Sequence, residues 1–190
     1  MRFTKLEKCV SKPHIRSMIY VLAFPVFDQP IAERIRAFRE LHEPQRAKLV
    51  PPHITLVFGV ANTHLETVSG LVETVSRRTT PIPVAFDSYV TEFDPFEKKY
   101  KIFLLCNEGS MAIKALHERL YEGAHRSELS ASHPFRPHMT IGTFDTQSDV
   151  DQVDVAAAGK LPITGQVSAL KLVQLEDGRL STLRTVPFPK

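Results

Sequence analysis

Two short stretches of the chain carry the same arrangement of a histidine and a threonine. Pro52-His53-Ile54-Thr55-Leu56 is followed by Gly59, and Pro137-His138-Met139-Thr140-Ile141 is followed by Gly142. An unperturbed imidazole titrates near pH 6.5, so it can give or take a proton close to neutrality. A threonine hydroxyl can donate a hydrogen bond to a phosphate oxygen without adding charge. Two such units facing one site would form a general acid–base pair for phosphate chemistry.

Each motif has the pattern of a β-strand with one polar and one apolar face. Side chains alternate along a strand, so residues i and i+2 share a face and lie about 7 Å apart. This alternation places His53 beside Thr55, and it places His138 beside Thr140 and Gly142. The aliphatic and methionine residues between them are expected to anchor each strand in the core.

A single histidine on a strand is usually a hydrogen-bonded structural residue. Here the match occurs twice, with proline before it, apolar residues around the threonine and glycine nearby. None of the other six histidines is followed two positions later by threonine: His14, His42, His64, His117, His125 and His133. The doubled motif therefore favours catalytic roles for His53, Thr55, His138 and Thr140.

On these residues the chain resembles the two-histidine phosphoesterase superfamily, which includes 2′-5′ RNA ligase-like proteins and 2′,3′-cyclic nucleotide phosphodiesterases. The resemblance covers most of the chain, from about Ser17 to Pro187. It implies an α+β fold of two pseudo-symmetric lobes, each an antiparallel sheet with helices packed outside. The cleft between the lobes would carry both motifs. The resemblance also implies that His53 is the acid and His138 the base that activates water.

The hydrophobic periodicity and the turn residues by themselves predict an α+β protein with about seven strands and four helices. Helices are expected from Asp28 to Pro44, after a capping box at Thr63–Glu66, from a Ser110 cap to about Gly123, and over 147–159. Strands are expected at 17–24, 54–59, 82–93, 100–106, the second motif, 166–175 and 181–187.

Composition indicates a single globular domain, and the small positive net charge is compatible with an anionic substrate. The chain has 190 residues, 43% of them hydrophobic, and a net charge of +3, which is far from the charge of a dedicated nucleic-acid binder. We expect residues 1–16 to be a basic N-terminal extension and 17–190 a single bilobal domain. Cys9 and Cys106 form no disulfide framework, which predicts free thiols in the cytoplasm. We expect no membrane segment and no obligate protein partner.

We expect neither a metal nor a cofactor, because the chain has no H-E-x-x-H motif and its carboxylates do not cluster around the two motifs. Two further residues are candidates for substrate binding. Arg136 precedes His138 by two positions and can reach a phosphate, or it is a solvated loop residue. Tyr100 lies in the charged stretch 97–101, which suits a nucleobase and its backbone, although a solvated hairpin edge has the same composition.

The leading hypothesis is an enzyme that hydrolyses 2′,3′-cyclic or related cyclic phosphodiesters of nucleotides. One alternative is a 2′-5′ RNA ligase or RNA-end phosphodiesterase in RNA processing, and another is a non-catalytic nucleotide-binding module. Many RNA ligase-like proteins carry a basic residue soon after the second motif, where this chain has Gly142-Thr143-Phe144. This difference favours small cyclic nucleotides or short ends over long RNA, and the glycine would let a phosphate approach the backbone.

Overall fold

The computed structural model describes residues 17–130 and 134–190, which form two antiparallel four-stranded sheets. The expected basic extension, 1–16, and His133 lie outside the described residues. The first sheet has the order β2-β1-β7-β8: β1 (Met18–Ala23), β2 (Ile54–Ala61), β7 (Ala169–Glu176) and β8 (Arg179–Pro187). The second has the order β5-β4-β3-β6: β3 (Ile82–Asp94), β4 (Lys99–Glu108), β5 (His138–Phe144) and β6 (Ile163–Val167).

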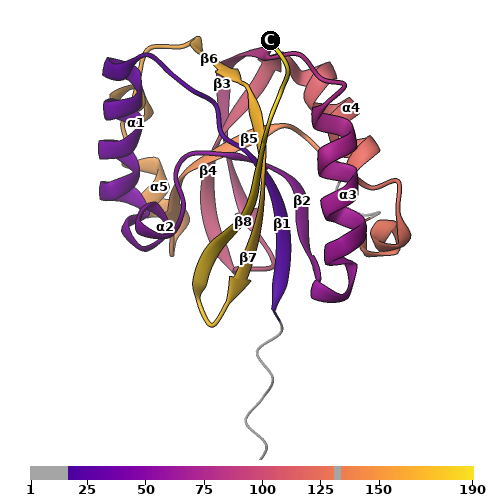
Figure 1. The fold of residues 1–190 in the computed structure, drawn as a ribbon. Coiled ribbons are helices and arrows are strands. Elements are labelled where there is room, and N and C mark those ends of the chain that lie inside the picture. The colour runs from indigo at the N-terminus through magenta and orange to yellow at the C-terminus, as the bar shows by residue number, and fades with distance from the viewer. Residues whose placement is uncertain (1–16, 131–133) are drawn as a thin grey trace, which may run out of the picture.

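Helices cover both sheets. The α-helices are α1 (Gln29–His42), α2 (Pro44–Leu49), α3 (Leu65–Ser76), α4 (Ser110–Leu120) and α5 (Gln147–Asp151). Short 3₁₀ helices are η1 (Asn62–His64), η2 (Ala124–Glu128) and η3 (Val155–Ala158). Figure 1 shows α1, α2 and α5 on one side of the sheets and α3 and α4 on the other. The predicted α+β architecture of two sheet-based lobes is confirmed.

The two motif strands occupy equivalent places in their sheets. Strand β2 lies at the edge of the first sheet beside β1, and β5 lies at the edge of the second sheet beside β4. The two edge strands contact each other where the lobes meet. The residues that alternate with the motif side chains are almost completely buried: Ile54, Leu56, Met139 and Ile141. Burial of these apolar side chains anchors both strands, as the alternation predicted.

Several predicted elements differ from the structure. The expected strand at 166–175 is divided, because β6 pairs with β3 whereas β7 pairs with β1 and β8. The chain therefore changes sheets at Ser168, and the sheets have eight strands rather than seven. The expected helix at 147–159 is two short helices, α5 and η3. The first helix ends before Pro44, as predicted, but Pro44 also begins a further short helix, α2, since proline is tolerated in the first turn of a helix.

Asp28 occupies the N-cap position of α1, in agreement with the predicted helix start, but the predicted caps at Thr63 and Ser110 are wrong. The turn η1 precedes α3, so that His64 rather than Thr63 occupies the N-cap position, without a side-chain hydrogen bond. Gly109 occupies the N-cap position of α4, where a φ of 79° suits glycine better than serine. A capping box does exist at Thr146 and Asp149, at the start of α5.

Cys106 is a free, buried thiol on β4. Burial raises its pKa to about 11, so the thiol stays protonated at neutral pH. Cys9 lies outside the described residues. In the part of the chain that the structure describes, no helix has the length and apolar character needed to cross a membrane.

Candidate active site

The two motif histidines are held by the same backbone contact. The Nδ1 atom of His53 lies 2.8 Å from the carbonyl oxygen of Pro51, and that of His138 lies 2.7 Å from the carbonyl oxygen of Arg136. A carbonyl oxygen only accepts hydrogen bonds, so each Nδ1 carries the proton and donates it. In the neutral imidazole Nε2 is then the acceptor, and neither Nε2 has a protein partner within the described residues. Each motif thus presents one free basic nitrogen.

The threonines accompany the histidines on the same strand faces. Thr55 lies opposite Leu22 of β1, and Thr140 lies opposite Phe103 of β4. Neither hydroxyl has a hydrogen-bond partner in residues 17–130 and 134–190, so both remain available to a ligand. We call the space between the two sheet faces that carry His53, Thr55, His138 and Thr140 the cleft.

The environment of His53 favours its neutral form. Burial is the main cause and lowers the pKa of His53 to about 4, although the hydrogen bond to the Pro51 carbonyl opposes this shift. The positive charges of Arg46 and Arg39 lower the pKa further. A protonated His138 also lowers the pKa of His53, so the two imidazoles are near enough for their charges to interact.

His138 is neutral for similar reasons. Burial is again the main cause of its lowered pKa, and its hydrogen bond to the Arg136 carbonyl opposes the shift. The side-chain charges of Arg136 and Lys101 lower the pKa, while Glu92 raises it. Positively charged side chains therefore lie near both imidazoles, an arrangement that suits an anionic ligand.

A buried ion pair supports the segment that leads into the first motif. Arg39 lies on α1 and is 2% exposed, and Glu43 follows the end of this helix and is 4% exposed. The Arg39 Nε donates a hydrogen bond to a Glu43 carboxylate oxygen. The Arg39 Nη1 also donates to the carbonyl oxygen of Val50 at 2.9 Å. The second Glu43 oxygen accepts from the Thr143 hydroxyl on β5 at 3.2 Å. The pair therefore links α1, the approach to His53 and the strand of the second motif.

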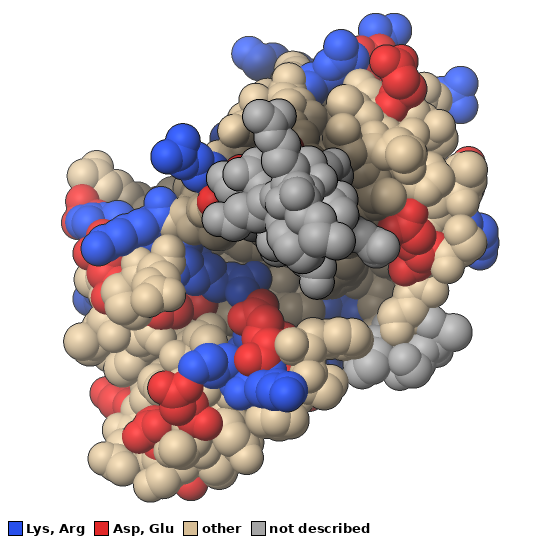
Figure 2. Space-filling model, turned by 90° about the horizontal axis from the view of Figure 1, so that it is seen from below, with Lys and Arg blue, Asp and Glu red and all other residues tan. Residues whose placement is uncertain are grey.

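Most cations near the cleft are already paired with carboxylates. Arg136 lies 2.6 Å from Glu92, and Arg46 lies 3.0 Å from Glu97. The side chain of Lys101 is 5% exposed, and its ammonium group contacts both Asp94 and Glu97. Figure 2 likewise shows Lys and Arg lying among Asp and Glu on the face seen from below.

The structure separates the two secondary candidates. Arg136 lies beside His138, where its carbonyl orients the imidazole and its guanidinium pairs with Glu92. Tyr100 lies on the opposite face of the second sheet from Thr140, so the structure does not bring this substrate-binding candidate together with the motif residues. It packs against the core, with its ring 5.1 Å from that of Phe93.

The expected role of Gly142 is also wrong. A bulge between Ile102 and Phe103 places Gly142 opposite the buried Ile102 rather than on the face of Thr140. A Cβ atom at position 142 would lie 2.7 Å from the ring of Phe144. The glycine therefore makes room for core packing and not for a phosphate.

Aromatic and basic residues that the sequence did not single out lie beside the histidines. The ring of Phe103 is 4.4 Å from that of His138, and the ring of Phe24 is 5.9 Å from that of His53. The ammonium group of Lys171 on β7 stands 4.6 Å from the centre of the Phe24 ring. Phe103 and Lys171 lie on β4 and β7, and Phe24 directly follows β1, so only the pairing of distant segments reveals these neighbours.

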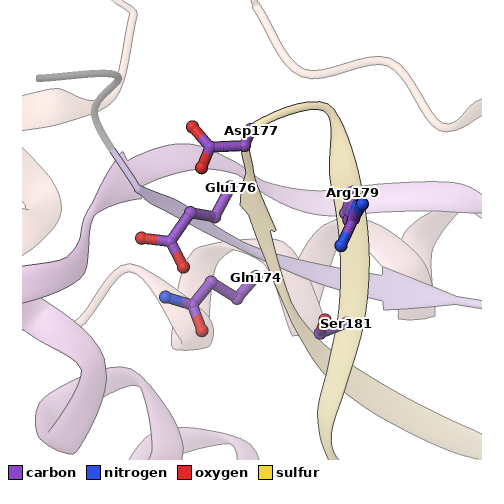
Figure 3. A pocket seen from close by; sticks show the side chains of 5 residues that line it. All are labelled: Gln174, Glu176, Asp177, Arg179 and Ser181. Atoms are coloured by element: carbon purple, nitrogen blue, oxygen red, sulfur yellow. The ribbon is translucent and has the colours of Figure 1, made fainter. Parts of the chain in front are cut away.

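Other polar features lie outside the cleft. His125 precedes Ser127 by two positions, but it is on η2 and its Nε2 donates to the Leu120 carbonyl. A hollow of about 400 Å³ at the β7–β8 turn is lined by Gln174, Glu176, Asp177, Arg179 and Ser181. Figure 3 shows that none of these side chains belongs to either motif. Among the described residues, no group of three or more His, Cys, Asp or Glu side chains has the arrangement of a metal site.

Comparison with known proteins relates the whole arrangement to one family. A model of the 2′-5′ RNA ligase superfamily matches residues 27–179. No curated protein matches the chain.

Solved structures share the fold at low sequence identity. E. coli LigT complexed with 3′-AMP is 18% identical, with a TM-score of 0.60 over 92% of this chain and 99% of that one. The protein TT0787 of Thermus thermophilus is 18% identical, with a TM-score of 0.59 over 90% and 97%. Kluyveromyces marxianus Usb1 is 14% identical, with a TM-score of 0.59 over 90% and 98%.

Proposed function

The chain belongs to the 2′-5′ RNA ligase superfamily, and we propose that it is a phosphodiesterase that hydrolyses 2′,3′-cyclic or closely related nucleotide phosphodiesters. The observation that carries this proposal is the pair of matched histidine contacts. Both imidazoles donate from Nδ1 to the carbonyl oxygen two residues before them, which leaves Nε2 of each for proton transfer. The fold and the family support an enzyme of this class, and the two histidines supply its acid and its base.

The reaction is an in-line displacement at phosphorus. One imidazole Nε2 takes a proton from water as the water oxygen bonds to phosphorus. The bond from phosphorus to one ribose oxygen breaks, and the second imidazole, in its protonated form, gives a proton to that oxygen. Thr55 and Thr140 donate hydrogen bonds to the non-bridging oxygens as negative charge grows on them. Each proton transfer of this kind typically contributes about 10²–10⁴-fold to the rate.

The reaction requires one of the two histidines to be protonated in the complex with substrate. In the free chain burial keeps His53 neutral with a pKa of about 4, and the pKa of His138 is lowered as well. The negative charge of a bound phosphodiester opposes both shifts, because an anion close to an imidazole favours the imidazolium form. The resemblance to the two-histidine phosphoesterase superfamily assigns the role of acid to His53 and the role of base to His138. We retain this assignment as part of the proposal, with the bound phosphate supplying the charge that raises the pKa of His53.

The charge distribution favours a small substrate over a long RNA. A long strand requires several unpaired cations along its path. Here Arg136, Arg46 and Lys101 are each bound to carboxylates. Lys171 stands over Phe24 and makes no ion pair with the described residues. An unpaired cation beside an aromatic ring suits a single nucleotide.

The proposal is tested by incubating the protein with the four 2′,3′-cyclic nucleoside monophosphates, with and without a chelator. We expect turnover that the chelator leaves unchanged, and product analysis will identify the ribose oxygen that leaves. The RNA-end alternative predicts turnover only on oligonucleotides, with an affinity that falls steeply as salt is raised. Tight nucleotide binding without turnover of either substrate would support the non-catalytic alternative.

A further inference from the structure

His117 contacts the strand that carries the first motif. It lies on α4, is 5% exposed, and its Nδ1 is 2.7 Å from the carbonyl oxygen of Leu56, the residue after Thr55. Since a carbonyl only accepts, Nδ1 donates this hydrogen bond. β2 is an edge strand, so the outward backbone groups of Leu56 have no strand partner. His117 therefore satisfies a free backbone group next to the catalytic threonine.

Tyr121, the C-cap residue directly after α4, makes a second contact of this kind. The hydroxyl of Tyr121 accepts a hydrogen bond from the backbone N–H of Phe58 at 3.1 Å. Leu56 and Phe58 are two residues apart, so their backbone groups point to the same side of the strand. The side chains of His117 and Tyr121 thus take the place of a neighbouring strand along the free edge of β2, and they fix the position of this edge relative to α4.

The other contact of His117 reaches the second motif. Its imidazole stacks on the ring of Phe135, with the ring centres 3.9 Å apart and the planes at 14°. Phe135 precedes His138 by three residues, and Arg136, whose carbonyl orients the His138 imidazole, follows directly. One buried side chain therefore touches both chain segments that present the catalytic groups.

We propose that His117 is a positioning residue that couples the two half-sites, by hydrogen bonding to the first motif strand and stacking on the segment that leads into the second. This inference rests on the proposed function, since it assigns His117 to the same phosphodiesterase site. It makes the separation of the two imidazoles depend on a side chain that touches no substrate. Misplacement of reacting groups by about 1 Å can reduce a rate by about 10²-fold, so the coupling matters for turnover.

The chain provides a matched control for this proposal. His125 is also a buried histidine, and it also donates from one ring nitrogen to a backbone carbonyl at 2.7 Å, that of Leu120. Its ring neighbours are His64 and Tyr121, and it contacts neither motif. His117 is also a ring neighbour of Tyr121. Loss of the buried histidine at position 125 therefore reproduces the general disruption, including the loss of a ring beside Tyr121, without a direct contact to either motif.

The experiment compares the full-length protein with His117→Ala, His117→Asn, His125→Ala and Phe135→Leu. Asparagine keeps a side-chain N–H donor near the position of Nδ1 but loses the stacked ring, and Phe135→Leu removes the stack alone. Steady-state hydrolysis of 2′,3′-cyclic AMP gives kcat and KM. Independently of activity, the NMR signals of the His53 and His138 imidazoles report the pH at which each one titrates.

We expect His117→Ala to lower kcat about 10–100-fold with KM changed by less than about threefold, and to shift the titration of both imidazoles. His117→Asn should recover most of the change at His53, and His125→Ala should leave both titrations as they are. Phe135→Leu, in which His117 remains, should shift His138 and, through His117, also His53.

The proposal is overturned if a folded His117→Ala protein keeps both titrations, or if His125→Ala moves them equally. If His117→Ala does not fold, Phe135→Leu tests the proposal instead. A shift in the titration of His138 alone, with that of His53 unchanged, would then overturn the coupling. If the wild-type protein hydrolyses no cyclic nucleotide, the proposed function fails while the NMR comparison still decides whether His117 couples the two histidines.

Discussion

The buried Arg39–Glu43 pair is predicted to position the first motif without adding to the stability of the fold. Burial raises the pKa of the Glu43 carboxyl even though Arg39 and Arg46 act against this shift. Removing the carboxylate from water therefore outweighs its attraction to the nearby cations. An ion pair of this kind is often replaceable by apolar residues, whereas breaking it on one side leaves an uncompensated charge in the interior.

The expected magnitudes follow from the contacts of the pair. Glu43→Leu leaves the Arg39 guanidinium buried and unpaired, which should lower the free energy of unfolding by about 3–5 kcal/mol. The double variant Arg39→Met/Glu43→Leu removes both charges. It loses the hydrogen bond from Arg39 to the Val50 carbonyl, and an unsatisfied carbonyl costs about 1–3 kcal/mol. The double variant should therefore be more stable than Glu43→Leu by about 2 kcal/mol.

Urea unfolding of the wild type, both single variants and the double variant measures these differences. Hydrolysis of a cyclic nucleotide then separates the effect on stability from the effect on the position of His53. Val50 lies three residues before His53, and in the double variant its carbonyl has lost the hydrogen bond from Arg39. We expect about half of the stability lost in Glu43→Leu to be restored in the double variant, and activity to remain low. Destabilisation of the double variant equal to the sum of the two single effects would refute the reasoning on burial, and full activity would refute the positioning role.

Three further predictions concern His53 and two glycines. Because His53 has a pKa of about 4 in the fold and near 6.5 in the unfolded chain, the free energy of unfolding should fall as pH is lowered from about 6.5 to 4, and urea titrations should show a smaller fall for His53→Gln. Arg46→Gln removes a positive charge close to His53, so the NMR titration of this imidazole should move to higher pH. Gly59→Ala should lower the free energy of unfolding by about 1–3 kcal/mol, because the added Cβ would lie 2.8 Å from the Tyr20 hydroxyl. Thermal unfolding should show this as a lower melting temperature. Its control, Gly70→Ala on an open helical surface, should raise stability by about 0.5–1 kcal/mol.

The sequence was sufficient to predict the two motif strands because their signal is local. Alternation within each motif predicts which side chains share a face, and the buried Ile54 and Met139 confirm that reading. The same rule failed at Gly142, because a β-bulge adds a residue and reverses the alternation beyond it. A bulge depends on the partner strand, so the motif alone does not reveal it.

The remaining features depend on contacts between distant segments. Phe24, Phe103 and Lys171 reach the cleft through strand pairing, and no local spacing marks them. His117 has no motif around it, and its importance comes from two contacts on different segments. The charged stretch 97–101 suggested contacts to a nucleobase and its backbone, but the Lys101 ammonium group in it is paired with Asp94 and Glu97. Composition reports how many charges exist and not which ones remain unpaired.

The central claim is that His53 and His138 act together in one displacement at phosphorus. It is tested most directly by comparing kcat for 2′,3′-cyclic AMP hydrolysis in His53→Ala, His138→Ala and the double variant, each shown to be folded by its circular dichroism spectrum. Groups that act as a unit have strongly non-additive effects. We predict that each single variant loses about 10²–10⁴-fold and that the double variant is little worse than the less active single one. Near-normal activity of either single variant, or independent losses that multiply in the double variant, would contradict the paired-histidine account.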